Sequence, residues 1–133
     1  MKQLPLEQMM ADRLGVALSG SEGQFIELIV DARYAVVLEF SREDVVFLAK
    51  LISLPVNAEQ QVALLRQVAG VRFKLARVCQ EQIYFDVKDN GLMVRRILKR
   101  VQASLPVLET QLQNFLNTLQ YFKEMLAPYE AGS

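Results

Sequence analysis

An Asn-Gly pair at residues 90 and 91 narrows the possible folds of this chain more than any other local pattern. Residues 83–88 precede the pair and residues 92–101 follow it, and both runs are rich in large apolar side chains typical of strands. Asn-Gly favours a two-residue type I′ turn, so an antiparallel hairpin is predicted here. The register of that turn sets two well-matched cross-strand pairs, Asp86 with Arg95 and Val87 with Val94.

The rest of the chain divides into helical and strand-like segments by its hydrophobic period. Helical spacing predicts three helices, over residues 5–14, 57–79 and 104–127. Strand composition predicts three strands ahead of the hairpin, over residues 24–31, 34–41 and 45–53. The predicted order is therefore α-β-β-β-α-β-β-α. We expect a single α+β domain over residues 1–133, with an antiparallel sheet flanked by helices.

The predicted helix over residues 57–79 contains Gly70, an unfavourable residue inside a helix. A helix that ends at Gly70, followed by a strand from Val71, is the alternative. The long helix is preferred because its wheel is coherent and a close neighbour can explain the glycine. One apolar stripe of this wheel suits packing on the chain's own sheet: Leu64, Val68, Val71, Leu75, Val78 and Cys79. A second, narrower stripe needs another partner and predicts a dimer through Val62, Leu65, Ala69, Phe73 and Ala76.

Composition argues against several classes of function. The chain has 133 residues, 52% of them hydrophobic, and its 15 basic and 15 acidic residues cancel, so it lacks the basic balance typical of nucleic-acid and membrane-surface proteins. It has no histidine and one cysteine, Cys79, so no catalytic residue, metal site or cofactor is predicted. The single cysteine, together with the lack of a signal-peptide pattern and of a membrane-spanning stretch, predicts a cytoplasmic protein. The lack of candidate catalytic residues predicts that it is not an enzyme.

The densest charge cluster lies in the second strand of the hairpin and comprises Arg95, Arg96, Lys99 and Arg100. On a strand these cations divide between the two faces, and aromatic side chains for base stacking are missing. We expect a solvated, partly paired strand end. The hairpin register puts Arg96 beside Phe85, from where it snorkels or reaches a partner's carboxylate.

The order and spacing of the elements resemble the class I type III secretion chaperones, the Tir-chaperone (CesT-like) family, over almost the whole chain. The segments that carry the resemblance are the opening helix ending at Leu14-Gly15, strands 25–30 and 35–40, the third strand running into Leu54-Pro55, the helix around Leu64-Leu65, the Asn90-Gly91 hairpin and the closing helix from Phe115 to Leu126. The resemblance implies a bacterial cytoplasmic homodimer whose second helix packs on its twin. It also implies that each protomer binds an extended segment near the N-terminus of a secreted effector protein, without ATP.

We expect the effector segment to lie along the first helix and the mixed faces of the first two strands. The core and the dimer use the other apolar surfaces, and flexible methionine side chains suit varied sequences. One of Met9 and Met10 is expected in the core and the other at the surface. The candidate partner-binding residues are Leu6, Met9, Met10, Leu14, Phe25, Ile29 and Val37.

Three alternatives remain open at this point. A protein of the same fold can act as a regulatory partner of a transcription factor or a secretion gatekeeper. A dimer can form with a related chaperone instead of a second copy. A small nucleic-acid-binding domain that uses the basic cluster is the third alternative, and its binding to random DNA would depend strongly on salt.

Overall fold

A computed structural model describes residues 5–20, 24–32, 34–75, 81–86 and 88–129. Its elements are α1 (Leu6–Leu14), β1 (Phe25–Val30), β2 (Tyr34–Phe40), β3 (Asp44–Ser53), α2 (Ala58–Leu75), β4 (Gln82–Asp86), β5 (Gly91–Lys99) and α3 (Leu105–Leu126), with short 3-10 helices η1 (Arg100–Gln102) and η2 (Ala127–Tyr129). The predicted order α-β-β-β-α-β-β-α is confirmed.

The five strands form one antiparallel sheet in the order β1-β2-β3-β5-β4. The two central partners, β3 and β5, come from distant parts of the sequence, and β1 and β4 are the edge strands. The strand predicted over residues 45–53 is present as β3, and it is the longest described strand, at ten residues. Its alternating burial shows why it is so apolar: one face lies in the core and the other is only partly covered.

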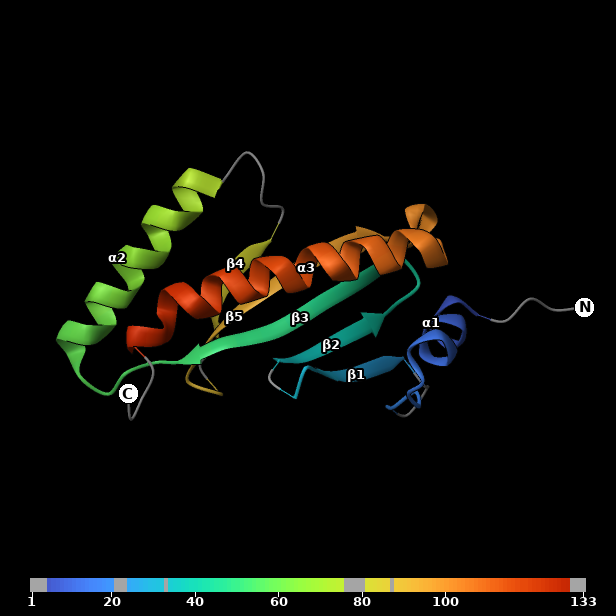
Figure 1. Ribbon diagram of the computed structural model, residues 1–133, viewed down its shortest axis with the longest axis horizontal. Coiled ribbons are helices and arrows are strands. Elements are labelled where there is room, and N and C mark those ends of the chain that lie inside the picture. Colours follow the sequence, from blue (N-terminus) through green and yellow to red (C-terminus); the bar gives the residue numbers. More distant parts are fainter. Residues whose placement is uncertain (1–4, 21–23, 33, 76–80, 87, 130–133) are drawn as a thin grey trace, which may run out of the picture.

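Helix α3 lies diagonally across one face of the sheet and closes the core (Figure 1). The Ser104 hydroxyl accepts a hydrogen bond from the Val107 backbone N–H at 3.4 Å, which caps the start of the helix. Phe115 of α3 packs against Phe47 of β3, with ring centroids 5.8 Å apart. The buried stripe of α3 follows the helical period: Leu108, Leu112, Phe115, Leu119, Phe122 and Leu126.

The hairpin is present, but the predicted register is wrong. Asp86 lies opposite Gly91, and Arg95 lies opposite Gln82. Four residues, 87–90, therefore connect the strands in place of a two-residue turn; Val87 itself is outside the described residues. Asn90 does take a positive φ, of 46°, as an Asn-Gly pair favours. The Asp86 carboxylate accepts a hydrogen bond from the Lys88 backbone N–H at 3.0 Å and so stabilises the start of the longer loop.

The true register puts Arg96 on the core face near Glu81, where both side chains are buried and form an ion pair. Arg96 also donates a hydrogen bond from Nη1 to Gln111 of α3 at 2.7 Å. The expectation that Arg96 lies beside Phe85 and snorkels outward was wrong. This arginine links β5, the start of β4 and α3 inside the core.

Helix α2 runs through Gly70 to Leu75, so the alternative of a strand from Val71 is wrong. The Asn57 side chain accepts hydrogen bonds from the backbone N–H groups of Glu59, at 2.8 Å, and Gln60, at 3.2 Å, as expected of an N-cap. A Cβ at Gly70 would meet nothing within 4 Å. The close neighbour expected to explain this glycine is therefore not found among the described residues. Cys79 and Ala76 lie outside the described residues.

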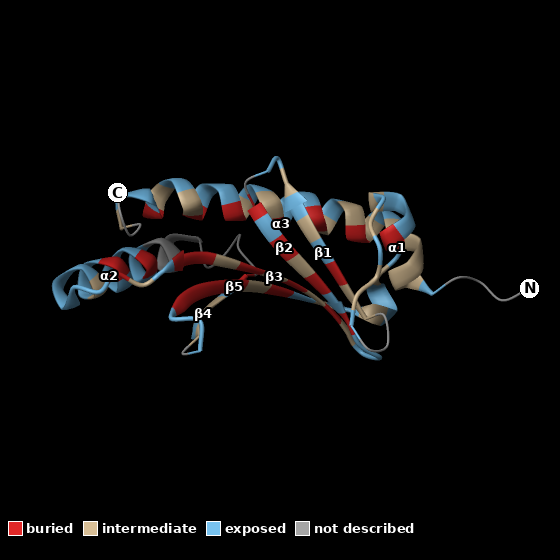
Figure 2. Ribbon diagram, turned by 90° about the horizontal axis from the view of Figure 1, so that it is seen from below, coloured by how far each residue is buried: buried red, intermediate tan, exposed pale blue. Residues whose placement is uncertain are grey.

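Helices α1 and α2 lie at opposite ends of the long axis of the molecule (Figure 1). Gly15, with φ 71°, ends α1 in the left-handed conformation, at the position where the sequence predicts the helix end. The described helices leave the sheet face opposite α3 uncovered (Figure 2). The molecule thus has two separate regions, one at each end, that can meet a partner.

Candidate protein-binding site

The outer edge of β1 is only partly covered by the chain itself. Phe25 exchanges two backbone hydrogen bonds with Ser19, of 2.8 and 3.1 Å, on the side away from β2. The carbonyl of the neighbouring residue, Gln24, accepts from Phe40 of β2 on the inner side. Because backbone groups alternate along a strand, the N–H and C=O groups of Glu27 and Ile29 point outward. No described strand pairs with them, and this stretch is a free sheet edge.

The side chains next to this edge form an apolar surface on the open face of the sheet. Ile29 is 77% exposed and lies opposite Ala35, while Glu27 lies opposite Val37. Phe25 and Val37 are half-buried. Three of the predicted partner-binding residues, Phe25, Ile29 and Val37, therefore share one face. An exposed isoleucine beside an unpaired edge is the arrangement that strand addition requires.

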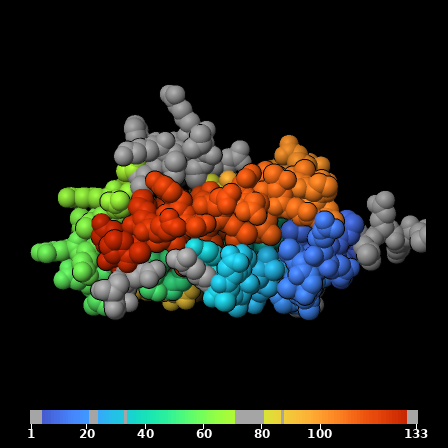
Figure 3. Space-filling model, viewed as in Figure 1, coloured from blue at the N-terminus to red at the C-terminus, as the bar shows by residue number. Residues whose placement is uncertain are grey.

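Helix α1 supplies the adjacent margin, and α1, β1 and β2 lie side by side below α3 in the space-filling view (Figure 3). Leu6, Met9 and Leu14 are half-buried, and Leu6 and Leu14 pack against the core with part of their side chains. Met10 is fully buried in the core, so it is the methionine that packs inside and it offers no surface to a partner. Met10 is therefore removed from the candidate partner-binding residues, whereas Met9 remains a candidate.

The open face continues past the predicted residues onto the central strands. Val46 and Leu48 of β3 are partly exposed, and Ile97 of β5, opposite Val46, is 45% exposed. Sequence reasoning did not single out these three. Their positions alternate with the buried Val45 and Phe47, so the strand period was a signal that could have identified them.

All four cations of the basic cluster have partners within the chain. Arg95 donates to Gln82 at 2.8 Å and lies over the Tyr84 ring, 5.1 Å from its centroid. Arg96 pairs with Glu81. Lys99 pairs with Asp44 at 3.2 Å, and Arg100 pairs with Glu7 at 2.6 Å. The expectation of a partly paired strand end is confirmed, but Arg96 is buried and not solvated as expected. These contacts do not favour a site for nucleic acid.

Tyr84 is the residue of this face with a shifted pKa. Burial raises the pKa of the Tyr84 phenol from its ordinary value, the Arg95 guanidinium opposes the shift, and the Asp86 carboxylate adds to it. The phenol is therefore neutral near pH 7. It presents an uncharged aromatic surface at the β4 end of the open face.

At the opposite end of the molecule, the first half of α2 has the buried and exposed sides that its wheel predicts, while the side chains of residues 71–80 lie outside the described part of the chain. Leu64 and Val68 are buried against the chain, whereas Val62 and Leu65 are 49% and 48% exposed and Ala69 is exposed with them. The side chain of Phe73 and the whole of Ala76 lie outside the described residues. Val62 also lines a shallow surface hollow with Ala58, Glu59 and Arg66. The described part of the second stripe is an uncovered apolar helix face.

Within the described ranges, no group of three or more histidine, cysteine, aspartate or glutamate side chains is arranged to hold a metal ion. Nor is any described helix long and apolar enough to cross a membrane. The surfaces found are suited to contacts with another polypeptide.

No protein-family model and no curated protein sequence matches this chain. Solved structures do. A chain of the ExsC-ExsE complex superposes with a TM-score of 0.69 at 20% identity, over 96% of this chain and 92% of that one. The chain has the fold of the type III secretion chaperones.

Two further structures share this secretion-chaperone fold. A chain of the HopA1-SchA chaperone-effector complex matches with a TM-score of 0.65 at 20% identity, over 90% of this chain and 91% of that one. A chain of the heterodimeric ExoU-SpcU complex from the type III secretion system of Pseudomonas aeruginosa matches with a TM-score of 0.68 at 14% identity, over 93% and 99%. In all three comparisons the similarity extends over nearly the whole length of this chain and of the chain it is superposed on.

Proposed function

We propose that this protein is a non-enzymatic cytoplasmic chaperone of a bacterial type III secretion system. It binds an extended segment near the N-terminus of a secreted effector and keeps that segment soluble and competent for export. The observation that carries the proposal is the free edge at Glu27 and Ile29, with exposed apolar side chains on its open face and the half-buried margin of α1 beside it. The shared fold with a chaperone-effector complex supports it.

The mechanism is capture of a strand by backbone pairing together with apolar anchors. The outward backbone groups of β1 give hydrogen bonds to any sequence, and the side-chain positions beside them select apolar residues. Each apolar anchor contributes about 1 to 2 kcal/mol by the area it buries. Several modest anchors allow tight binding of a flexible segment that can still be released at the export apparatus.

A second copy of this chain is the proposed occupant of the exposed α2 stripe. The buried stripe of α2, with Leu64 and Val68, already packs on the chain itself. The other stripe remains exposed in the monomer at Val62, Leu65 and Ala69. A self-complementary contact between two α2 helices buries this stripe twice in one interface. Because α2 and α1 lie at opposite ends of the molecule, the dimer leaves both effector surfaces accessible (Figure 1).

The proposal is tested by capture from the native cell, followed by limited proteolysis of the complex and mass spectrometry of the protected fragment. We expect one fragment from the N-terminal region of a secreted protein, unfolded when isolated. Ile29→Glu combined with Val37→Glu places two charges on the apolar surface and should prevent capture. The matched control is Gln67→Glu, at an exposed position on the α2 face away from the second stripe.

A protected fragment from a transcription factor or a gatekeeper subunit would favour the regulatory alternative over export. Equal capture by the Ile29→Glu, Val37→Glu variant would place the effector elsewhere. Binding to random DNA that weakens steeply with salt would favour the nucleic-acid alternative.

A further inference from the structure

Helix α1 depends on contacts with the rest of the chain for its position. It has nine residues, too few for a stable helix in isolation, and its buried residues are Met10 and Ala11. Two ion pairs supplement that packing. Arg13 pairs with Glu109 of α3 at 3.0 Å, but the side chains are 64% and 38% exposed, and such pairs contribute little. The other pair, Glu7 with Arg100, is the shielded one, with side chains 20% and 27% exposed.

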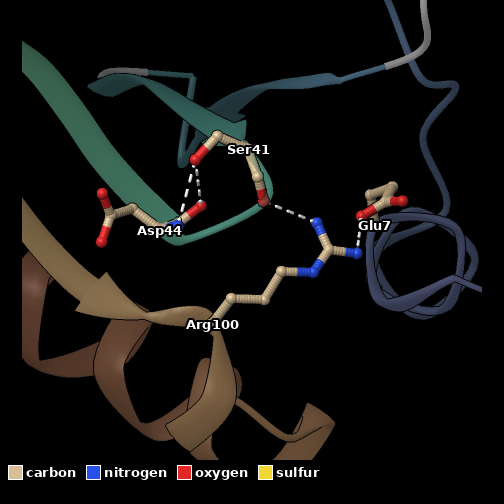
Figure 4. A network of polar contacts seen from close by, with 4 residues as sticks. All are labelled: Glu7, Ser41, Asp44 and Arg100. Carbon is tan, nitrogen blue, oxygen red and sulfur yellow. Dashed lines mark hydrogen bonds and ion pairs between the residues drawn. The ribbon is translucent and has the colours of Figure 1, made fainter.

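Arg100 joins three segments that are far apart in the sequence (Figure 4). Its Nη2 donates to the Glu7 carboxylate at 2.6 Å, and its Nη1 donates to the Ser41 carbonyl at 2.9 Å. Its backbone N–H donates to the Glu43 carbonyl at 2.8 Å. The end of β5, the β2–β3 turn and α1 are thereby connected through one residue.

The turn that receives Arg100 is itself held in place. The Ser41 hydroxyl accepts from the Asp44 backbone N–H at 3.0 Å, and the Ser41 backbone N–H donates to the Asp44 carbonyl at 2.9 Å. The Asp44 carboxylate also pairs with Lys99, but the Lys99 side chain is 62% exposed, so this pair adds little to the stability of the turn. The guanidinium is planar and presents its donors in a fixed fork. Because Ser41 fixes one arm of the fork, the other arm fixes the direction in which Glu7, and with it α1, lies.

We infer that Arg100 is a positioning residue for effector binding: it holds α1 at the end of the sheet, where α1 forms one margin of the binding surface. The inference rests on the proposed function. Arg100 itself need not touch the effector. Its contribution is that α1 is ordered before the effector arrives, which lowers the entropy lost on binding.

The test measures hydrogen exchange of the α1 amides in the free full-length protein, and affinity for the protease-protected fragment recovered from the wild-type complex. Arg100→Met and Glu7→Gln should each raise the exchange rate of α1 at least about tenfold and weaken fragment binding about three- to tenfold. The double variant should be no worse than the single ones, because both remove the same contact. Arg100→Lys, which keeps the charge without the fork, should fall between wild type and Arg100→Met.

Two matched controls separate this contact from general loss of charge. Arg13→Met removes the exposed pair from the same helix, and Lys99→Met removes the neighbouring cation that pairs with Asp44. Both should stay within about twofold of wild type in exchange and in affinity. Unchanged α1 exchange in Arg100→Met overturns the positioning role while leaving the proposed function intact. Faster exchange with unchanged affinity reduces Arg100 to a structural role, and a wild-type protein that yields no protected fragment overturns the proposed function and this inference with it.

Discussion

Glu81, the residue before β4, and Arg96 of β5 form an ion pair that is almost completely removed from solvent. The pair connects the residue before the edge strand β4 to the strand β5, and the hydrogen bond from Arg96 to Gln111 extends the connection to α3. A slip of the hairpin to the register with a two-residue turn would separate the two side chains and leave a charge buried without its partner. Because an unpaired buried charge is strongly destabilising, the ion pair favours the observed register over the register with a two-residue turn.

Removal of one member of this pair should be strongly destabilising. Arg96→Met leaves the Glu81 carboxylate buried without its cation, and we expect a loss of about 3 kcal/mol or more in the free energy of unfolding. The double variant Arg96→Met with Glu81→Leu should recover most of this loss, because no charge is left buried. Urea unfolding of the three proteins measures both values. The exposed pair gives the matched comparison: Lys99→Met should cost less than about 1 kcal/mol.

Two glycines should respond in opposite directions to alanine. Gly70 is helical with open space around its Cβ position, so Gly70→Ala should stabilise the protein by about 0.5 to 1 kcal/mol. Gly20 has φ 90°, and a Cβ there would lie 2.6 Å from the Phe25 ring, so Gly20→Ala should destabilise by more than about 1 kcal/mol. Thermal unfolding distinguishes the two. A loss of stability in Gly70→Ala would contradict the open surroundings of α2 and indicate a second chain packed at that glycine.

The order of the elements could be predicted from the sequence because each element carries its own period and end signals. Asn57 caps α2, Gly15 ends α1 and the apolar stripe of α3 faces the sheet, all as local rules require. The hairpin register could not be predicted in the same way. Asn90-Gly91 favours a tight turn locally, but the buried contact between Glu81 and Arg96 depends on the tertiary structure and overrides it.

The candidate site was predictable where the strand period decides which face a side chain takes. Phe25, Ile29 and Val37 fall on the open face for that reason. Met9 and Met10 are adjacent on one helix, and the sequence does not determine which of them turns toward α3 and the sheet. The free edge of β1 could not be predicted from the sequence either. It depends on tertiary pairing: Ser19 pairs with Phe25, and no described strand pairs with Ile29.

The protein should be a dimer at micromolar concentration through the second stripe of α2. Val62→Asp combined with Leu65→Asp places two unpaired charges in the contact and should produce a folded monomer, because the core residues Leu64 and Val68 are untouched. Light scattering with the Gln67→Asp control checks the change in mass, and circular dichroism checks the fold. A wild-type particle of 15.1 kDa at all concentrations would remove the homodimer, and a variant that stays dimeric would move the interface away from α2.

Proline substitutions along β1 should separate its outer edge from its inner edge. Ile29 directs its N–H away from β2, so Ile29→Pro should leave the β1–β2 pairing intact and cost less than about 1 kcal/mol of stability. Leu28 directs its N–H toward β2, and Leu28→Pro should cost clearly more, about 1 to 3 kcal/mol, because it leaves a carbonyl of β2 without its donor. This difference can be measured on the free protein by urea unfolding. Equal costs at the two positions would mean that the assignment of the outer edge is wrong.

The same proline then tests how the effector is captured. Ile29→Pro removes an outward donor and puts a ring where an added strand must approach, so affinity for the protected effector fragment should fall at least about tenfold, or about 1.4 kcal/mol. Ile29→Ala keeps the donor and loses only the side chain, so its loss should be smaller and follow the apolar area removed. Isothermal titration of both variants with the fragment gives the comparison. If Ile29→Ala weakens binding as much as Ile29→Pro does, side-chain contacts and not strand addition hold the effector on this edge.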